Sequence, residues 1–125
     1  METIAREGAR TMKALLTQTC VPCSGDSPPV TDAEIAELKP LIPDWEIIEE
    51  NDELHLQRVY KFPDFQTALI FTQRVGEEAD KQGHHPALLT EWGKVTVTWW
   101  THAIKGLHRN DFIMAAKTDM IATQF

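Results

Sequence analysis

The stretch over residues 65–82 constrains the fold most, because its apolar side chains recur at helical spacing and strand-like segments flank it on both sides. The spacing predicts a long helix that buries one face. Asp64 is a suitable N-cap, and Gly83 stands where helices often end in a left-handed residue. Pro86 prevents the helix from resuming, so the chain is expected to turn sharply just before His84. The residues expected on the buried face are Phe65, Ala68, Leu69, Thr72, Val75 and Ala79.

A β-hairpin is predicted on each side of this helix. Residues 45–50 and 54–62 are expected to be strands joined by a turn at Asn51-Asp52, and residues 88–92 and 95–101 form a second pair around Gly93-Lys94. Successive side chains of a strand alternate between two faces. One face of the first hairpin carries Leu54, Leu56, Tyr60 and Phe62, with Arg58 as the charged exception. In the second, Val95, Val97 and Trp99 face one way, and Thr96, Thr98 and Trp100 the other.

Two further helices complete the element order. Thr31 and Glu34 form a capping box for a short helix that Pro40 ends, and the last helix is expected from about Arg109 to the C-terminus. The order helix, hairpin, helix, hairpin, helix predicts an α+β fold in which a four-stranded antiparallel sheet has helices packed on one face. The other face is then open to solvent or to a partner, and the edge strands invite pairing with another subunit.

Composition narrows the class of protein. The chain of 125 residues carries a formal net charge of -7, which argues against a nucleic-acid partner, since phosphate contact needs clustered Lys and Arg. No apolar run is long enough to span a membrane, and the charged start does not resemble a signal peptide, so we expect a cytoplasmic protein. We expect residues 1–30 to be a flexible N-terminal extension and residues 31–125 to be one folded domain. Cys20-Val-Pro-Cys23 is compatible with a redox pair or half a zinc site, but reduced thiols in a mobile segment are the favoured interpretation.

The candidate functional residues are histidines and carboxylates in the second half of the chain. Asp80 precedes the pair His84-His85 by one helical turn, and His102 and Asp111 follow. Imidazole gives and takes a proton near neutral pH, and a neighbouring carboxylate can hold it in one tautomer. Three interpretations compete: a metal site of three His and a carboxylate, structural histidines, or a metal-free acid–base site. The His-His-Pro spacing matches no common zinc pattern.

The pattern Asp80-x3-His84-His85-Pro86, followed by Trp92, His102 and Asp111, resembles the signature of the pterin-4a-carbinolamine dehydratases. The resemblance covers about residue 31 to the C-terminus, including the order of the elements. It implies a hydro-lyase that dehydrates 4a-hydroxytetrahydropterin to quinonoid dihydropterin and so recycles the pterin cofactor of aromatic amino-acid hydroxylases. It also implies that no metal or cofactor is needed, and that the protein forms a homodimer or homotetramer.

The same resemblance assigns roles to residues. His84 and His102 would alternate as acid and base, and His85 would position the substrate. Asp80 would orient a histidine, and Asp111 would support the site. The residues expected to meet the pterin are Gly83, His84, His85, Trp100, Thr101, His102, Ala103 and Trp45, although a core position is equally open for Trp45.

Two departures from the family pattern bear on the site. His108 stands where relatives often carry Ser or Thr, which predicts a weaker helix cap. Trp100 replaces a smaller polar residue and would alter the shape of the pocket. An alternative function also follows from the resemblance: animal relatives act as dimerisation cofactors of a homeodomain transcription factor, so a non-catalytic binding or assembly module on the same fold stays open.

Overall fold

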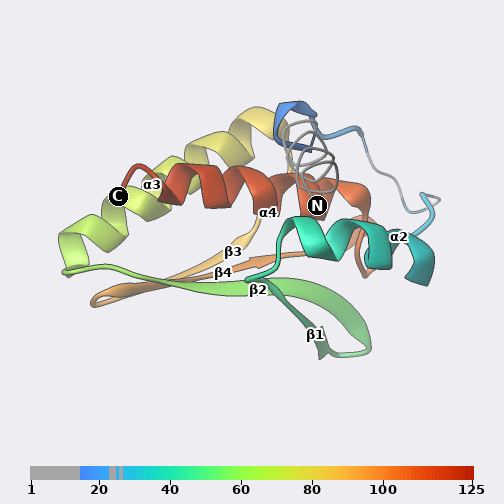
Figure 1. Cartoon of the computed structure of the whole chain (residues 1–125), viewed down its shortest axis with the longest axis horizontal. Coiled ribbons are helices and arrows are strands. Elements are labelled where there is room, and N and C mark those ends of the chain that lie inside the picture. Colours follow the sequence, from blue (N-terminus) through green and yellow to red (C-terminus); the bar gives the residue numbers. More distant parts are fainter. Residues whose placement is uncertain (1–14, 23–24, 26) are drawn as a thin grey trace, which may run out of the picture.

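The computed structural model describes residues 15–22, 25 and 27–125. Its elements follow the predicted order: α2 (Asp32–Leu38), the short 3-10 helix η1 (Lys39–Leu41), β1 (Glu46–Glu50), β2 (Glu53–Lys61), α3 (Phe65–Gln82), β3 (Ala87–Glu91), β4 (Lys94–Trp99), the 3-10 helix η2 (His102–Ile104) and α4 (Arg109–Ala122). The strands form one antiparallel sheet in the order β1-β2-β4-β3. Figure 1 shows α3 and α4 on the same side of this sheet, so the predicted fold class is confirmed. No described helix is long and apolar enough to cross a membrane.

The turns and caps arise from local sequence. Asn51 and Asp52 both take positive φ, as a tight two-residue hairpin turn requires. Thr31 Oγ1 accepts from the Glu34 amide, and Glu34 Oε1 accepts from the Thr31 amide, so the predicted capping box is confirmed. Gly83 has φ 67° in the left-handed region that other residues rarely adopt.

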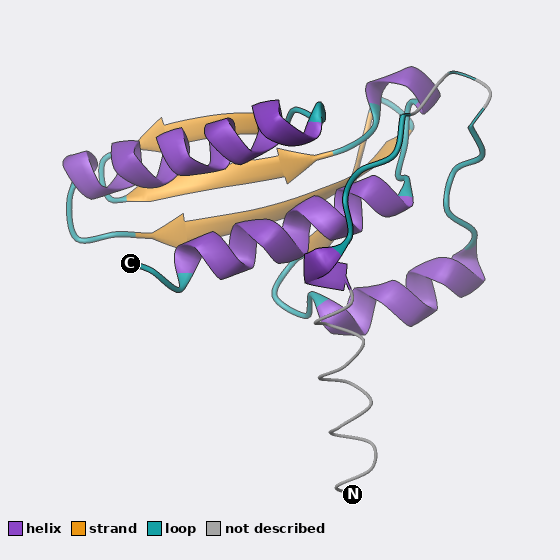
Figure 2. Ribbon diagram, turned by 90° about the horizontal axis from the view of Figure 1, so that it is seen from above, coloured by secondary structure: helices purple, strands orange, loops and turns teal. Residues whose placement is uncertain are grey.

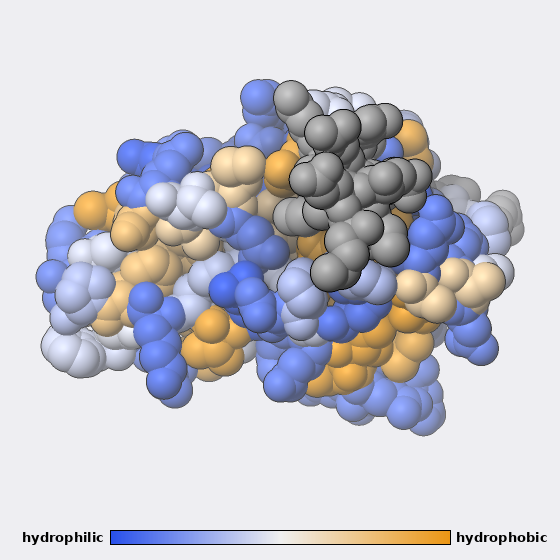
Figure 3. Space-filling model, viewed as in Figure 1, coloured by the Kyte–Doolittle hydropathy of each residue, from blue (hydrophilic) through white to orange (hydrophobic). Residues whose placement is uncertain are grey.

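The core lies between the sheet and the two long helices. Figure 2 shows α3 and α4 side by side over the sheet, with α2 on the side of α4 that faces away from α3. Val95, Val97 and Trp99 of β4, which were predicted to share one face, are fully buried, so this face of the strand is the inward one. Leu56 and Tyr60 of β2 are also buried, whereas Leu54 near the hairpin turn is exposed. On the visible face, hydrophobic side chains form patches separated by hydrophilic ones (Figure 3).

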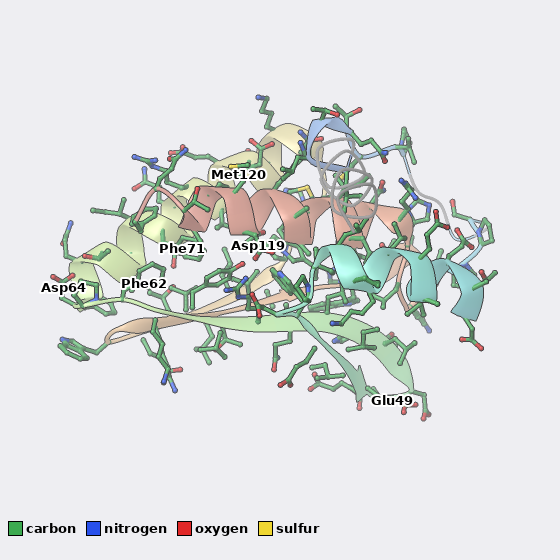
Figure 4. All side chains as sticks on the ribbon, in the orientation of Figure 1. Glu49, Phe62, Asp64, Phe71, Asp119 and Met120 are labelled. Atoms are coloured by element: carbon green, nitrogen blue, oxygen red, sulfur yellow. The ribbon has the colours of Figure 1, made fainter. Side chains whose placement is uncertain are left out.

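The buried face of α3 differs from the prediction. Ala68, Val75 and Ala79 are buried as expected, but Phe65 and Leu69 are 43% and 42% exposed. Phe71 is buried instead, and its ring lies 4.9 Å from that of Phe62. Figure 4 shows these two rings between α3 and β2. The reason is that the sheet determines which stripe of the helix is covered, and helical spacing alone leaves this rotation open.

Arg58, the charged exception on the inward face of β2, pairs with the last helix. Its Nη1 lies 2.7 Å from Asp119 Oδ1, and its guanidinium lies 4.5 Å from the centroid of the Tyr60 ring. Asp119 also accepts hydrogen bonds from Trp45 Nε1 at 2.9 Å and from the Tyr60 hydroxyl. Figure 4 shows Asp119 on the side of α4 that faces the sheet. Burial and the Asp119 charge raise the pKa of Tyr60, so the phenol keeps its proton and acts as a donor.

Residues 15–22 lie against the folded domain. Leu15 is buried in the core, and the backbone amides of Cys20 and Val21 donate to the side chains of Gln82 and Asn110. These residues belong to the extension that was expected to be flexible, and they make specific contacts with the end of α3 and the start of α4. A boundary at residue 30 stays a prediction, and residues 1–14 and Cys23 lie outside the described residues.

Candidate active site

A cavity of about 450 Å³ opens where the end of α3, the end of β4 and the start of α4 meet. This volume lies within the range of about 300–1,000 Å³ that is usual for small-molecule sites. Four segments contribute to its wall. The lining residues are Cys20, Val21, Pro22, Gln82, Gly83, His84, His85, Thr101, His102, Ala103 and Asn110.

The end of α3 determines where His84 and His85 stand. The His84 amide donates to the Ala79 carbonyl at 3.1 Å, across the left-handed Gly83. This six-residue closure is the Schellman type of helix end, which terminates the helix and redirects the chain at once. The two histidines then diverge. His84 is 9% exposed and points inward, whereas His85 is exposed on the surface.

His84 is held by a buried carboxylate. Its Nε2 lies 2.6 Å from Oδ1 of Asp111, whose side chain has no exposed surface. Its ring is parallel to that of Trp99 within 7°, with the ring centroids 5.6 Å apart. The carboxylate and the indole therefore determine the orientation of the imidazole. Since Nε2 is engaged by Asp111, the remaining ring nitrogen, Nδ1, is the one available to a ligand in the cavity.

Asp111 has a full set of partners. Its Oδ2 accepts from the Thr101 hydroxyl at 2.8 Å and from the His108 amide at 2.9 Å. Because three donors surround it, the buried carboxylate is compensated without a cation in direct contact. Asp111 also lies in the first turn of α4, where the helix dipole favours a negative charge. The carboxylate thus links the start of α4, the end of β4 and His84.

His108 does act as the N-cap of α4. Its Nδ1 accepts from the Asn110 amide at 3.1 Å, so an imidazole occupies the position of the more usual hydroxyl. Its own amide donates to Asp111, which completes a capping box. The cap bond is present, and the weaker capping predicted for His108 stays a prediction. His108 is also the donor that joins the cap to the site carboxylate.

His102 lines the same cavity from a different segment. It is the first residue of η2, in a short loop closed by a hydrogen bond of 2.8 Å from the Thr101 amide to the Gly106 carbonyl. The His102 side chain is exposed, and its ring centroid lies 4.5 Å from that of Trp100. Trp100 in turn stacks on the buried His55 at 4.2 Å. The spacing of the sequence gave no sign of this row of rings, because His55 lies on the distant β2.

Asp80 contacts His85 rather than His84. Its Oδ1 lies 3.1 Å from His85 Nε2, and both side chains are mostly exposed. Exposed pairs of this kind contribute little to stability, so the contact matters mainly because it orients the His85 ring. Within the described residues, no three His, Cys, Asp or Glu side chains are grouped so as to hold a metal ion. The alternative of a centre made by three His and a carboxylate therefore lacks a ligand set there.

Two residues expected at the site lie apart from the cavity. Trp45 is 1% exposed in the core, edge-on to Tyr60, and does not line the cavity. Its core position is explained by its hydrogen bond to Asp119, a partner that the sequence did not reveal. Trp100 is half-buried beside His102 and is not among the lining residues either. The other predicted binding residues, namely Gly83, His84, His85, Thr101, His102 and Ala103, all line the cavity.

Sequence reasoning missed one wall of the cavity. Cys20, Val21 and Pro22 line it, and Asn110 and Gln82 hold their backbone. Burial raises the pKa of the Cys20 thiol to about 11, and the Asp111 charge acts in the same direction. Cys20 is half-buried between α3 and α4, in contrast to the mobile thiol that the composition suggested. The apolar pair Leu15-Leu16 just before it was the available signal.

Comparisons with known proteins agree with the fold and with the family resemblance. The family described as pterin 4 alpha carbinolamine dehydratase matches residues 28–121. A protein of Gloeobacter violaceus, provisionally named pterin-4-alpha-carbinolamine dehydratase 1, is 61% identical over 110 residues, which cover 88% of this chain and 95% of that protein. A Nitrosococcus oceani protein with the same provisional family name is 58% identical, over 88% of this chain and 97% of its own length.

A solved structure with lower sequence identity gives the same result. The transcriptional coactivator/pterin dehydratase from Brucella melitensis superposes with a TM-score of 0.68 and 30% sequence identity, over 76% of this chain and 99% of that one. The element order, the sequence match and the fold therefore point to one conclusion. The chain belongs to the pterin 4 alpha carbinolamine dehydratase family.

Proposed function

We propose that this protein removes water from 4a-hydroxytetrahydropterin to give quinonoid dihydropterin, and that the cavity at the ends of α3 and β4 is its active site. One observation carries the proposal: His84 and His102, from separate elements, line the same cavity, and His84 rests on the buried Asp111 carboxylate. The relatives at 58% and 61% identity carry the dehydratase name, which supports the same activity here.

The reaction requires two proton movements. The hydroxyl at C4a accepts a proton and leaves as water, while a ring nitrogen gives up a proton as the new double bond forms. An acid and a base on different sides of a flat ring suit this chemistry. Loss of water changes no oxidation state overall, so the step itself needs no redox cofactor. We propose that it runs without a metal, with imidazoles moving both protons.

His84 and His102 are assigned the alternating acid and base roles. The Asp111 carboxylate holds the His84 ring through Nε2, which leaves Nδ1 for the cavity. His85, oriented by Asp80 at 3.1 Å, is assigned to substrate positioning. Backbone groups of Gly83 and of the loop from Thr101 to Ala103 are suited to the amide-like edge of a pterin. Trp45 has no part in this scheme, because it is buried away from the cavity.

A dehydration assay with the two C4a stereoisomers tests the proposal. We expect His84→Ala and His102→Ala each to lower kcat by roughly 100-fold or more, in the range usual for a lost acid or base. Lys61→Ala is the control, since this residue is exposed at the end of β2 and does not line the cavity. Full activity in the His84→Ala/His102→Ala double variant would refute the assignment.

Assembly, location and partners extend the proposal. We propose that the chain works in the cytoplasm as a homodimer or homotetramer, linked to an aromatic amino-acid hydroxylase that produces its substrate. The outer face of the sheet supports association, because Val59, Thr96 and Leu89 lie opposite one another there. Val59 and Leu89 are 47% and 58% exposed, which is a usual property of an unpaired interface. Sedimentation equilibrium of wild type and of Leu89→Lys would test this.

The alternative function is a non-catalytic binding or assembly module. The Brucella melitensis protein is described both as a transcriptional coactivator and as a pterin dehydratase, so both functions have been associated with this fold. A binding module has no need of His84, His85 and His102 around one cavity, and their presence favours the enzyme. Absence of turnover with both stereoisomers, together with a stable protein partner, would reverse this judgement.

A further inference from the structure

A segment outside the family match closes one side of the cavity. Residues 18–22, here called the strap, run between the end of α3 and the start of α4. The Asn110 side chain holds the strap at Val21 by two hydrogen bonds: Val21 N donates to Oδ1 at 3.1 Å, and Nδ2 donates to Val21 O at 2.8 Å. The side-chain amide thereby pairs with the backbone as a neighbouring strand would. Cys20 N donates to Gln82 Oε1 at 3.1 Å and adds a bond to α3.

Further contacts anchor the chain that leads up to this clamp. Arg109 Nε donates to Gln18 Oε1 at 2.9 Å, and Lys117 Nζ donates to the Leu16 carbonyl at 2.8 Å. Leu15 is 1% exposed, so the chain just before the strap is fixed in the core. Asn110 itself is 2% exposed, and each of its side-chain atoms has a partner in the strap. A buried amide that loses these partners is left with unsatisfied polar atoms, which is unfavourable.

The strap gives the cavity an apolar wall. Cys20, Val21 and Pro22 line it, whereas the wall formed by the ends of α3 and β4 is rich in histidine. Only the backbone of Val21 is used by the clamp, and the residue is 55% exposed. The fold thus fixes this side chain in place without needing it for the core. An apolar side chain held at the edge of a cavity is suited to packing against a bound ring.

We propose that Cys20–Pro22 form a substrate-binding wall of the active site, and that Asn110 is the positioning residue that holds this wall. The inference rests on the proposed function, because it takes the cavity as the place where the pterin binds. Apolar packing against a flat ring is the same before and during the loss of water. Contacts of this kind change KM and leave kcat nearly unchanged.

Steady-state kinetics of three variants test the inference. We expect Val21→Ala and Asn110→Ala each to raise KM, by roughly threefold and roughly tenfold respectively, with kcat within about twofold of wild type. Val59→Ala is the matched control, since this valine is similarly exposed on the outer face of the sheet and away from the cavity. Thermal melting identifies any loss of folding in Asn110→Ala, and the exposed Val21 keeps the test valid if that variant unfolds.

A second measurement does not depend on turnover. In a Cys23→Ser background, Cys20 is the one remaining cysteine of the sequence. A bound oxidised pterin should slow its alkylation at least severalfold, because the ligand covers the wall to which Cys20 belongs. An unchanged KM in Val21→Ala and Asn110→Ala, or equal alkylation rates with and without pterin, would refute the proposed wall. The proposed active site would not be affected by either result. Full kcat in the His84→Ala/His102→Ala double variant would instead refute both the proposed active site and the proposed wall.

Discussion

His84 and Asp111 stand 27 positions apart, and a hydrogen bond of 2.6 Å joins Nε2 of the one to Oδ1 of the other. This bond connects the sharp end of α3 to the first turn of α4. Because Thr101 and the His108 amide bind the same carboxylate, one buried group holds three segments of the site together. The geometry of the proposed acid–base pair therefore depends on Asp111 more than on the exposed Asp80.

Asp111→Asn should lower kcat by roughly 100-fold, with a smaller effect on KM. The amide has one acceptor oxygen in place of two, so its NH2 group would face a donor and the orientation of His84 would be lost. Asp80→Asn is the matched control, because its partner His85 is exposed and the pair is weak. Initial rates across pH 6–9 would measure both. Equal losses in the two variants would contradict the central role of Asp111.

Arg58→Met should destabilise the protein by about 2 kcal/mol. The change leaves the Asp119 carboxylate with two donors but no cation, and both side chains of the pair are about a quarter exposed, so the loss is smaller than for a fully buried pair. Urea unfolding measures the free energy. Lys61→Met, on the exposed end of the same strand, is the control. Equal stability of the two variants would show that the Arg58 pair contributes nothing.

Alkylation of Cys20 in the Cys23→Ser background should be slow at pH 8. With a pKa of about 11 the thiolate fraction is about one in a thousand, roughly a hundredfold below that of a thiol at the reference pKa of 9.0. The rate should increase about tenfold per pH unit up to about pH 10. Unfolding in urea should remove the difference. A fast reaction of the folded protein at pH 8 would contradict the packing of Cys20 between α3 and α4.

Acid should remove stability through the cap of α3. Hydrogen bonds from the Thr67 hydroxyl and amide lower the pKa of the Asp64 carboxyl. A pKa that is lower in the folded state gives stability that is present at neutral pH and is lost as the pH falls through that pKa. Serine also caps helices but does not titrate, so Asp64→Ser should lose stability less steeply below about pH 4. The urea midpoints of wild type and Asp64→Ser are measured as a function of pH. Parallel curves for the two proteins would contradict the prediction.

Local chemistry made much of the fold predictable. The bounds of α3, the left-handed Gly83 and the Asn51-Asp52 turn each depend on a few neighbouring residues, and all three are confirmed. The buried stripe of α3 was not predictable, because Phe71 rather than Phe65 meets the aromatic side chains of β2 only after the helix docks. Arg58 was recognised as an exception, but its partner Asp119 comes from the far end of the chain.

The order of the elements, the bend before His84 and the identity of the residues that can move protons all follow from the amino-acid sequence. These are properties of adjacent residues, namely spacing, capping and backbone conformation. The packing of the chain sets the pairs His84–Asp111 and His85–Asp80, the core position of Trp45 and the contact of Val21 with Asn110. Such pairs join positions far apart in the chain, and their distances are set by how helices and sheet pack.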